Sequence, residues 1–154
     1  MRDDLVREDV LPFTPTIMRY TTQAKAKSLS NTPPAYGIYI CGLVFKWLKE
    51  MGGLSVMAER NKEKAAILYD YLDQSKLFRG TARKEDRSLM NVPFVTGSDE
   101  LDALFVAEAK SHGIESIKGH RSVGGMRASI YNAMPKAGVE ALVAFMAEFE
   151  KNNG

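Results

Sequence analysis

Apolar residues recur at helical spacing in several separate stretches of the chain. Between residues 36 and 51 they return every three or four positions, after Thr32-Pro33-Pro34 and before Gly52-Gly53. Proline in a first turn and glycine after a last turn are typical of helix ends. A helix with a wide apolar stripe is therefore predicted here.

The same spacing predicts three more helices. One runs from about residue 54 to residue 72, with its charged positions 59–64 on the solvated side. Another is capped by Ser98 and closed by Gly113, and the last begins near Pro135. The positions expected to be buried are Met57, Ala65, Leu68, Leu72, Leu101, Leu104, Phe105, Ala109, Val139, Leu142, Val143, Met146 and Phe149.

Shorter patterns indicate strands. Residues 88–95 alternate in polarity, and Pro93 cannot donate to a ladder, so this strand is expected at a sheet edge. A short strand is expected around 114–117 and another over 126–131. In the last strand, alternation sends Arg127 to the face opposite Met126. The whole order predicts an α/β fold, a small mixed or antiparallel sheet covered by helices.

The chain divides by pattern into two parts. Residues 1–34 have weak periodicity and carry Pro12 and Pro15, whereas residues 35–154 hold all the strong patterns. We expect 35–154 to form the C-terminal α/β domain. The apolar residues of 1–34 lack an element of their own to pack against, so this segment is expected to be disordered or to pair with another copy.

Composition excludes some function classes. The 154 residues carry a net charge of +2, from 21 basic and 19 acidic residues spread along the chain, which gives no concentrated basic field for nucleic acid. The apolar runs are shorter than the roughly 20 residues of a membrane span. Cys41 is the sole cysteine, which excludes an internal disulfide, and its apolar surroundings favour a buried thiol. The chain reads as cytoplasmic, with no nucleic-acid or membrane partner.

The segment from Gly119 to Arg127 is the first place where chemistry is expected. Glycines let a backbone approach a ligand, and arginine grips carboxylate or phosphate with two hydrogen bonds. His120, Arg121 and Arg127 together suggest a site for a doubly anionic small molecule. A solvated hairpin with unconnected cations fits the same residues, and both interpretations stay open. The glycine spacing matches neither a P-loop nor a dinucleotide-binding fingerprint.

The second place is Ser30-Asn31-Thr32-Pro33-Pro34. A helix N-terminus with Asn31 and Thr32 offers amides, a hydroxyl and a favourable dipole to a phosphate. Capping of the helix alone explains the same residues, and locally it is the favoured explanation. No metal-ligand cluster or nucleophile–base pair stands out elsewhere in the sequence.

These motifs resemble one family. Residues 119–135, Gly-His-Arg-Ser-Val-Gly-Gly-Met-Arg-Ala-Ser-Ile-Tyr-Asn-Ala-Met-Pro, look like the C-terminal signature of phosphoserine aminotransferases. Residues 30–34, 43–48 with Gly52-Gly53, and 91–94 are also similar to that family, in the family's order. The resemblance covers essentially the whole chain but matches only the family's C-terminal portion.

The resemblance implies a pyridoxal-phosphate enzyme of aminotransferase fold type I, working as a homodimer on glutamate and 3-phosphohydroxypyruvate to give O-phosphoserine. In bacteria the family also serves pyridoxine biosynthesis. By position, Asn31 and Thr32 would contact the cofactor phosphate, reaching it from the neighbouring subunit. Arg127 would bind the substrate carboxylate, and His120 and Arg121 the substrate phosphate. Residues 1–34 would belong to the large cofactor-binding domain.

The resemblance also implies a limit. The family's first two-thirds are absent from this sequence, including the lysine that forms the Schiff base, and none of Lys25, Lys27 or Lys46 matches its context. The chain therefore has no expected catalytic residue, and we expect it not to transaminate, and not to bind the cofactor, by itself. A stand-alone small-molecule-binding domain and a dimerisation module are the alternatives for the isolated chain.

Overall fold

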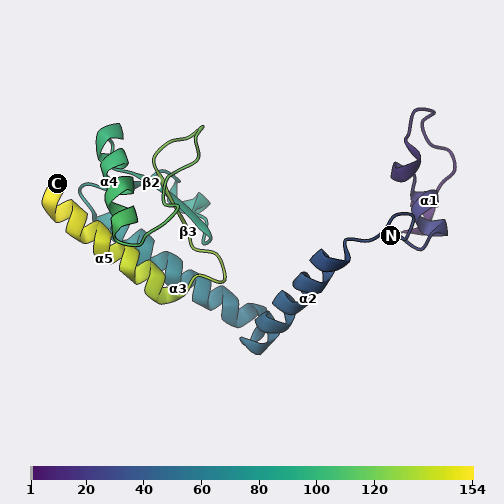
Figure 1. Cartoon of the computed structure of the whole chain (residues 1–154), viewed down its shortest axis with the longest axis horizontal. Coiled ribbons are helices and arrows are strands. Elements are labelled where there is room, and N and C mark those ends of the chain that lie inside the picture. The colour runs from purple at the N-terminus through teal and green to yellow at the C-terminus, as the bar shows by residue number, and fades with distance from the viewer. Residues whose placement is uncertain (1) are drawn as a thin grey trace. The chain divides into compact units, whose positions relative to one another are not determined.

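The chain forms two compact units in a computed structural model that describes residues 2–154 (Figure 1). The units are Met1–Trp47 and Leu48–Gly154. No helix of the described residues is long and apolar enough to cross a membrane. The two units are built in different ways.

The first unit is made of short helical turns. They are the 3-10 helices η1 (Asp3–Leu5) and η2 (Thr16–Met18), helix α1 (Tyr20–Lys25) and most of helix α2 (Ala35–Glu50). Polar contacts join the turns: Lys25 Nζ lies 2.8 Å from Glu8 Oε1, and Arg19 Nε donates to the Thr14 carbonyl at 3.2 Å. Thr21 is the only buried residue between positions 2 and 47, so this unit has no apolar core.

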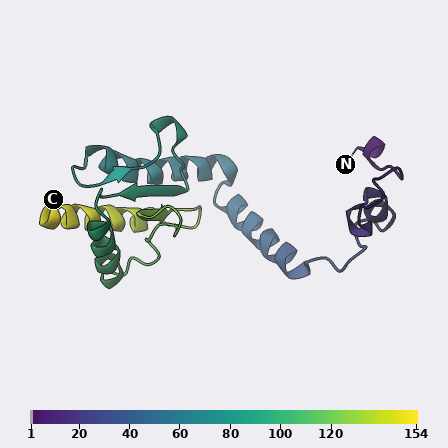
Figure 2. The same ribbon diagram turned by 90° about the horizontal axis from the view of Figure 1, so that it is seen from above.

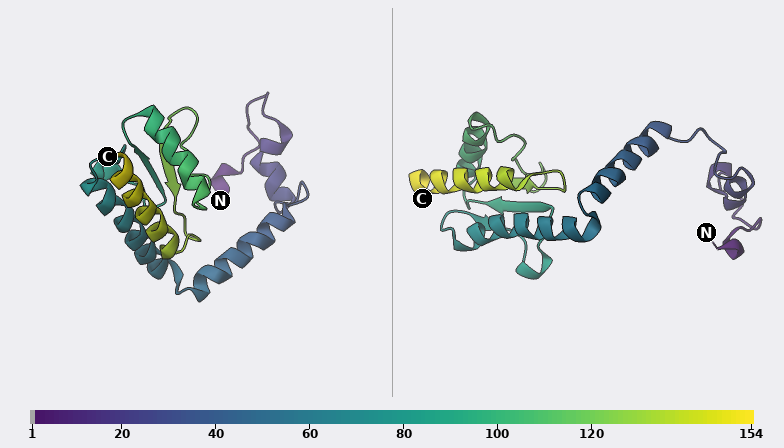
Figure 3. Two further views of the ribbon diagram at one scale, coloured as in Figure 1. Left: turned by 60° about the vertical axis from the view of Figure 1, so that its left-hand side comes forward. Right: turned by 90° about the horizontal axis from the view of Figure 1, so that it is seen from below.

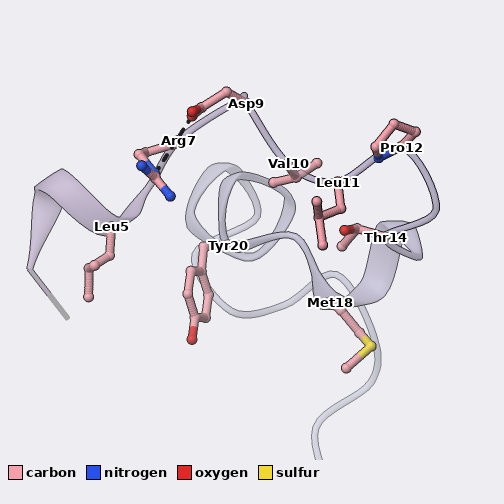
Figure 4. Close-up of a pocket in the computed structure, with 9 residues that line it drawn as sticks. All are labelled: Leu5, Arg7, Asp9, Val10, Leu11, Pro12, Thr14, Met18 and Tyr20. Atoms are coloured by element: carbon pink, nitrogen blue, oxygen red, sulfur yellow. Dashed lines mark ion pairs between the residues drawn. The ribbon is translucent and has the colours of Figure 1, made fainter.

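An open hollow of about 560 Å³ lies in the first unit (Figure 4). Its lining is mostly apolar, and Leu11, Met18 and Tyr20 are more than half exposed. The ion pair between Arg7 and Asp9 stands at its rim, with 3.6 Å between Nε and Oδ1. Apolar side chains gather here without enclosing one another.

Helix α2 confirms the helix predicted between residues 36 and 51, but its apolar stripe is not covered within the chain. No residue of α2 is buried, and Tyr36 remains 79% exposed. The expected burial of Cys41 is wrong for the same reason, because the thiol sits on this uncovered helix and is exposed.

A three-stranded antiparallel sheet organises the second unit. Its strands β1 (Arg79–Gly80), β2 (Asn91–Val95) and β3 (Met126–Ser129) lie in the order β1-β2-β3. Residues Val92 and Phe94 of β2 pair with Ala128 and Met126 of β3. This arrangement confirms the predicted α/β class with a small antiparallel sheet.

Three long helices complete the second unit: α3 (Gly53–Gln74), α4 (Asp99–Ser111) and α5 (Lys136–Asn153). Helices α3 and α5 lie side by side and run in the same direction (Figures 1 and 3). The sheet and the helices are seen from a second direction in Figure 2. Side chains from all three helices share one core with the inner face of the sheet, and its largest fully buried members are Leu68, Phe78, Val92, Phe94, Phe105, Met126, Val139, Met146 and Phe149.

Pro93 lies in the central strand, which corrects the prediction of an edge strand. Its carbonyl accepts from the Thr81 amide at 3.3 Å, so its backbone polar groups face the β1 side. Proline has no N–H to donate toward β1. Strand β1 ends at Gly80, just before Thr81, so the sheet loses no regular hydrogen bond at this position.

Three other expectations are wrong. Residues 114–117 form no strand; only Lys118 makes an isolated bridge, to Met126. Leu104 is 40% exposed, while Asp102 of the same helix is buried. Lys64, expected on the solvated side of its helix, is also buried. Side-chain hydrogen bonds explain both buried charges, and periodicity carries no information about such partners.

Candidate functional site

A closed loop over residues 119–125 joins the end of the 114–118 segment to β3. At its neck the Gly119 amide donates to the Gly125 carbonyl at 2.8 Å, and inside it the Gly124 amide donates to the His120 carbonyl at 2.9 Å. One step further, the Arg127 amide donates to the Ile117 carbonyl at 2.7 Å. These bonds tie the loop to the start of the strand that carries Arg127.

Glycine is required at both sides of the neck. A Cβ atom on Gly119 would overlap the carbonyl oxygen of Gly124. Gly125 has a φ of +63°, and a Cβ there would lie 2.6 Å from Val95 Cγ1. No other residue type fits these two backbones without displacing main-chain atoms.

His120 and Arg121 stand on the loop, and both are exposed. The Ser122 amide donates to His120 Nδ1 at 3.3 Å, and the Ser122 hydroxyl lies 2.7 Å from the same atom. Since Nδ1 accepts, the neutral ring carries its proton on Nε2. The exposed His120 ring therefore keeps an N–H donor for a ligand, and Arg121 is exposed on the same loop.

Arg127 lies on the face of the sheet opposite the core, as alternation predicts. Met126 and Ala128 beside it are buried, whereas Arg127 is half-buried. Its Nε atom is buried, and among residues 2–154 it has no hydrogen-bond partner. A buried N–H without a partner costs about 1–3 kcal/mol. The guanidinium thus suits an acceptor that these residues do not supply.

Arg127 also lines a cavity of about 330 Å³. The cavity runs along β3 between the 114–117 segment and the first half of α5. Most of its lining is apolar, but Glu115, Ser116 and Ser129 also contribute, beside Ala128, Ile130, Met134, Gly138, Val139 and Leu142. Arg127 is the cationic residue of this lining, and low polarity around a cation strengthens a charge-assisted hydrogen bond to an anion.

Asn31 and Thr32 belong to the first unit, immediately before α2, and both are exposed. Pro33 and Pro34 follow, and the Pro34 carbonyl accepts from the Ile38 amide at 3.0 Å in the first helical turn. An amide and a hydroxyl at the N-terminus of a 16-residue helix form a donor set that fits a phosphate group.

Sequence reasoning missed a buried carboxylate near the loop. Asp102 Oδ1 accepts from the Thr96 amide at 2.8 Å and from the Thr96 hydroxyl at 2.7 Å. A Cβ on Gly125 would lie 3.8 Å from Asp102 Oδ2, which places the carboxylate beside the base of the loop. The sequence signal was an acidic residue four positions after the helix cap Ser98, but this spacing does not predict that its side chain is buried.

Comparisons with known proteins agree along the whole chain. The family model for class-V aminotransferases matches residues 13–142. The chain belongs to the class-V aminotransferase family. A phosphoserine aminotransferase from Haemophilus influenzae is 55% identical over 153 residues, which are 99% of this chain and 42% of that protein.

Solved structures of class-V relatives share the fold. A phosphoserine aminotransferase from Bacillus circulans matches with a TM-score of 0.86 and 47% identity, covering 92% of this chain and 39% of its own. A PLP-bound phosphoserine aminotransferase from Trichomonas vaginalis matches with a TM-score of 0.81 and 42% identity, covering 90% of this chain and 40% of its own. The chain spans about 42% of the length of the curated relatives it matches.

Proposed function

We propose that the chain is the C-terminal part of a phosphoserine aminotransferase and supplies the residues that bind its substrate, His120, Arg121 and Arg127 (the substrate grip). The whole protein would transfer an amino group between glutamate and 3-phosphohydroxypyruvate, giving O-phosphoserine and 2-oxoglutarate. The observation that carries the proposal is the buried, unpartnered Nε of Arg127 beside a cavity, in a chain 55% identical to a phosphoserine aminotransferase.

The 119–125 loop and strand β3 would each hold one of the two anionic groups of the substrate. Arg127 would bind the α-carboxylate, since its guanidinium can donate two parallel hydrogen bonds to a planar acceptor. His120 and Arg121 would bind the phosphate, because their donors project from a loop with no other role in the core. The glycine neck supports this division by tying the loop to the start of β3.

Asn31 and Thr32 would hold the phosphate of pyridoxal phosphate, reaching it from the neighbouring subunit. Their exposed amide and hydroxyl fit a phosphate, as does the N-terminus of α2. When bound, the cofactor supplies an electron sink for the amino-group transfer. The chain itself contributes binding and orientation, because Lys25, Lys27 and Lys46 lack the family's context for the lysine bound to the cofactor.

The wider setting follows from the same proposal. The whole protein would act as a homodimer in the cytoplasm, in serine biosynthesis and, in bacteria, in pyridoxine biosynthesis. Residues 1–34 would belong to the large cofactor-binding domain and residues 35–154 to the C-terminal domain. Residues 2–34 fit the first part of this division, because their apolar side chains lack cover within the described chain, although helix α2 has no buried residue either.

Calorimetric titration of the chain with three ligands tests the substrate grip. O-phosphoserine carries both anionic groups, O-phosphoethanolamine lacks the carboxylate, and serine lacks the phosphate. We expect Arg127→Gln to weaken O-phosphoserine binding by about tenfold to a hundredfold, the worth of a hydrogen bond to a charged group. The same variant should leave O-phosphoethanolamine binding unchanged, whereas Arg121→Gln should weaken both phosphorylated ligands.

Arg79→Gln is the matched control, because Arg79 is an exposed arginine of the same sheet. It should bind all three ligands as the unmodified chain does. Failure of the unmodified chain to bind O-phosphoserine would count against a retained grip. Absence of binding with dimers persisting at low concentration would favour a dimerisation module. Turnover by the chain alone with glutamate and 3-phosphohydroxypyruvate would contradict the assignment of no catalytic lysine.

A further inference from the structure

A lysine buried in helix α3 holds the turn that follows β3. Lys64 is 4% exposed, and its Nζ donates to the carbonyls of Ile130 at 3.1 Å, Tyr131 at 2.8 Å and Met134 at 3.0 Å. An ammonium group has three protons and no acceptor. Each proton thus has one carbonyl, and the three carbonyls come from one short segment.

This cation is not paired with a carboxylate. Among residues 2–154, no ion pair includes Lys64, and burial lowers the pKa of its ammonium. Burying a charge is a costly way to stabilise a fold unless the charge fixes a geometry that apolar packing would leave loose. Three donors that converge on one turn fix its conformation closely.

A second side chain of the same helix face acts on the same turn. Asn61 is 4% exposed, and its Nδ2 donates to Asn132 Oδ1 at 2.7 Å. Asn61 and Lys64 are three residues apart, so both point from one side of α3. Helix α3 therefore holds the 130–134 turn at four atoms.

The 130–134 turn forms part of the wall of the cavity that Arg127 also lines. Ile130 and Met134 line that cavity together with Arg127 and Gly138. The Met134 sulfur lies so close to Gly138 that an added Cβ would be 2.6 Å from it. A shift of the turn would therefore move the Met134 side chain against α5 and change the shape of the cavity.

The turn is also continuous with the strand of Arg127. Ile130 follows Arg127 by three residues, and its amide donates to the Met90 carbonyl at 2.9 Å, which extends the β2–β3 ladder. Lys64 binds the carbonyl of that same Ile130. The end of β3 is thus fixed on one side by the sheet and on the other by the lysine.

We infer that Lys64 is a positioning residue for the carboxylate end of the anion site: it fixes the 130–134 turn and, through it, the cavity wall and the strand that present Arg127. The inference rests on the proposed substrate grip. It adds a residue of helix α3 that would position Arg127 from outside the 119–125 loop. Among the described residues, no hydrogen bond or ion pair joins Lys64 to the 119–125 loop, so the phosphate end should not depend on it.

Lys64→Met tests the inference, because Met keeps much of the aliphatic stem and removes the three donors. Titration calorimetry well below the unfolding midpoint measures O-phosphoserine and O-phosphoethanolamine binding to the full chain. We expect O-phosphoserine to bind about tenfold more weakly, the order of loss expected when a binding group is displaced. Binding of O-phosphoethanolamine should be unchanged. Equal weakening of both ligands would show a merely structural role and overturn the inference.

A ligand-free measurement separates this inference from the proposed function. We expect Lys64→Met to shift the NMR resonance of the Arg127 Nε–H group and to speed hydrogen exchange at the Met134 and Gly138 amides. Unchanged Arg127 and turn signals in the folded variant would overturn the inference even if the ligands bind. If the unmodified chain binds no O-phosphoserine, the proposed function fails, and these signals alone decide the role of Lys64.

Two further variants complete the design. Lys62→Met is the matched control, since Lys62 lies on the same helix with its side chain 60% exposed and paired only with Glu59. It should reproduce the unmodified chain in every measurement. If Lys64→Met does not fold, Asn61→Ala removes one bond to the turn and should give the same pattern with a smaller shift. An Asn61→Ala chain with unchanged Arg127 signals would then contradict the inference.

Discussion

Helices α2 and α5 have similar sequence patterns and opposite surroundings. They contain 16 and 18 residues, and both carry apolar side chains at helical spacing. Helix α5 buries five residues against α3, α4 and the sheet, whereas α2 buries none. Apolar residues at helical spacing therefore indicate that a helix has an apolar face, but they do not indicate which part of a protein packs against that face.

The same contrast separates the two units. In Leu48–Gly154, aromatic rings from different elements meet, as where Phe78 and Phe105 lie 5.1 Å apart between ring centroids. In Met1–Trp47 the joining contacts are exposed and polar, such as the Lys25–Glu8 pair. The chain spans about 42% of the length of the curated relatives it matches. In residues 2–47 the apolar side chains have no such cover among the described residues.

The largest effect is expected from removing a ring from α5 rather than from α2. Phe149 is 1% exposed, and Phe149→Ala should lower the free energy of unfolding by about 3–5 kcal/mol through lost burial and a cavity. Phe45 is 63% exposed, and Phe45→Ala should change it by no more than about 0.5 kcal/mol. Urea denaturation followed by circular dichroism measures both. Similar losses for the two variants would mean that α2 is covered in solution.

The next effect contrasts a glycine of the loop with a glycine of α2. Gly119→Ala should cost about 1–3 kcal/mol, because its methyl group overlaps the Gly124 carbonyl and the neck must open. Gly37→Ala meets nothing within 4 Å in α2 and should favour the helix by up to about 1 kcal/mol. Hydrogen exchange at the amides of each region checks the opposite signs. A stabilising Gly119→Ala would refute the closed neck.

Much of the fold could be predicted from local sequence signals. Helices α2 to α5 follow from apolar spacing with Gly52-Gly53, Ser98 and Gly113 at their ends, and β3 follows from alternation. Strand β1 could not be predicted, because two residues show no period and exist as a strand only by pairing with Val95 and Phe94. The 114–117 segment has strand-like composition but runs beside β3 without regular pairing.

The candidate site was predictable in its cations but not in its supports. Glycine and arginine spacing pointed to the Gly119–Arg127 segment, and alternation placed Arg127 on the open face. Lys64 and Asp102 lie within charged stretches, which normally face water. Lys64 binds the carbonyl of Ile130, 66 residues away in the sequence, and Asp102 binds Thr96, 6 residues away. Neither the distant partner of Lys64 nor the nearby partner of Asp102 leaves a mark in a periodic pattern.

The smallest effect contrasts two carboxylates as the pH is lowered. Burial raises the pKa of Glu150, but donors on Tyr71, Ser75 and the amides of Lys76 and Leu77 outweigh it, so the pKa is lowered overall. A lowered pKa in the folded state gives stability that is present above the unfolded pKa of about 4.3 and is lost as pH falls through the folded pKa. Glu150→Gln should thus cost about 1–2 kcal/mol at neutral pH and flatten the loss in acid.

Glu8 is the matched comparison in the first unit. The hydrogen bond from Lys25 lowers the pKa of Glu8 as well, but the pair is exposed and solvent screens it. Glu8→Gln should leave the urea midpoint unchanged at neutral and acid pH, while Glu150→Gln lowers it at neutral pH and nearly matches the unmodified chain in acid. If both variants kept the pH dependence of the unmodified chain, the acid-sensitive contacts would lie elsewhere. If Glu8→Gln alone removed it, the exposed Lys25–Glu8 pair would stabilise the chain more than the hydrogen bonds of the half-buried Glu150, and the contrast between the units would fail.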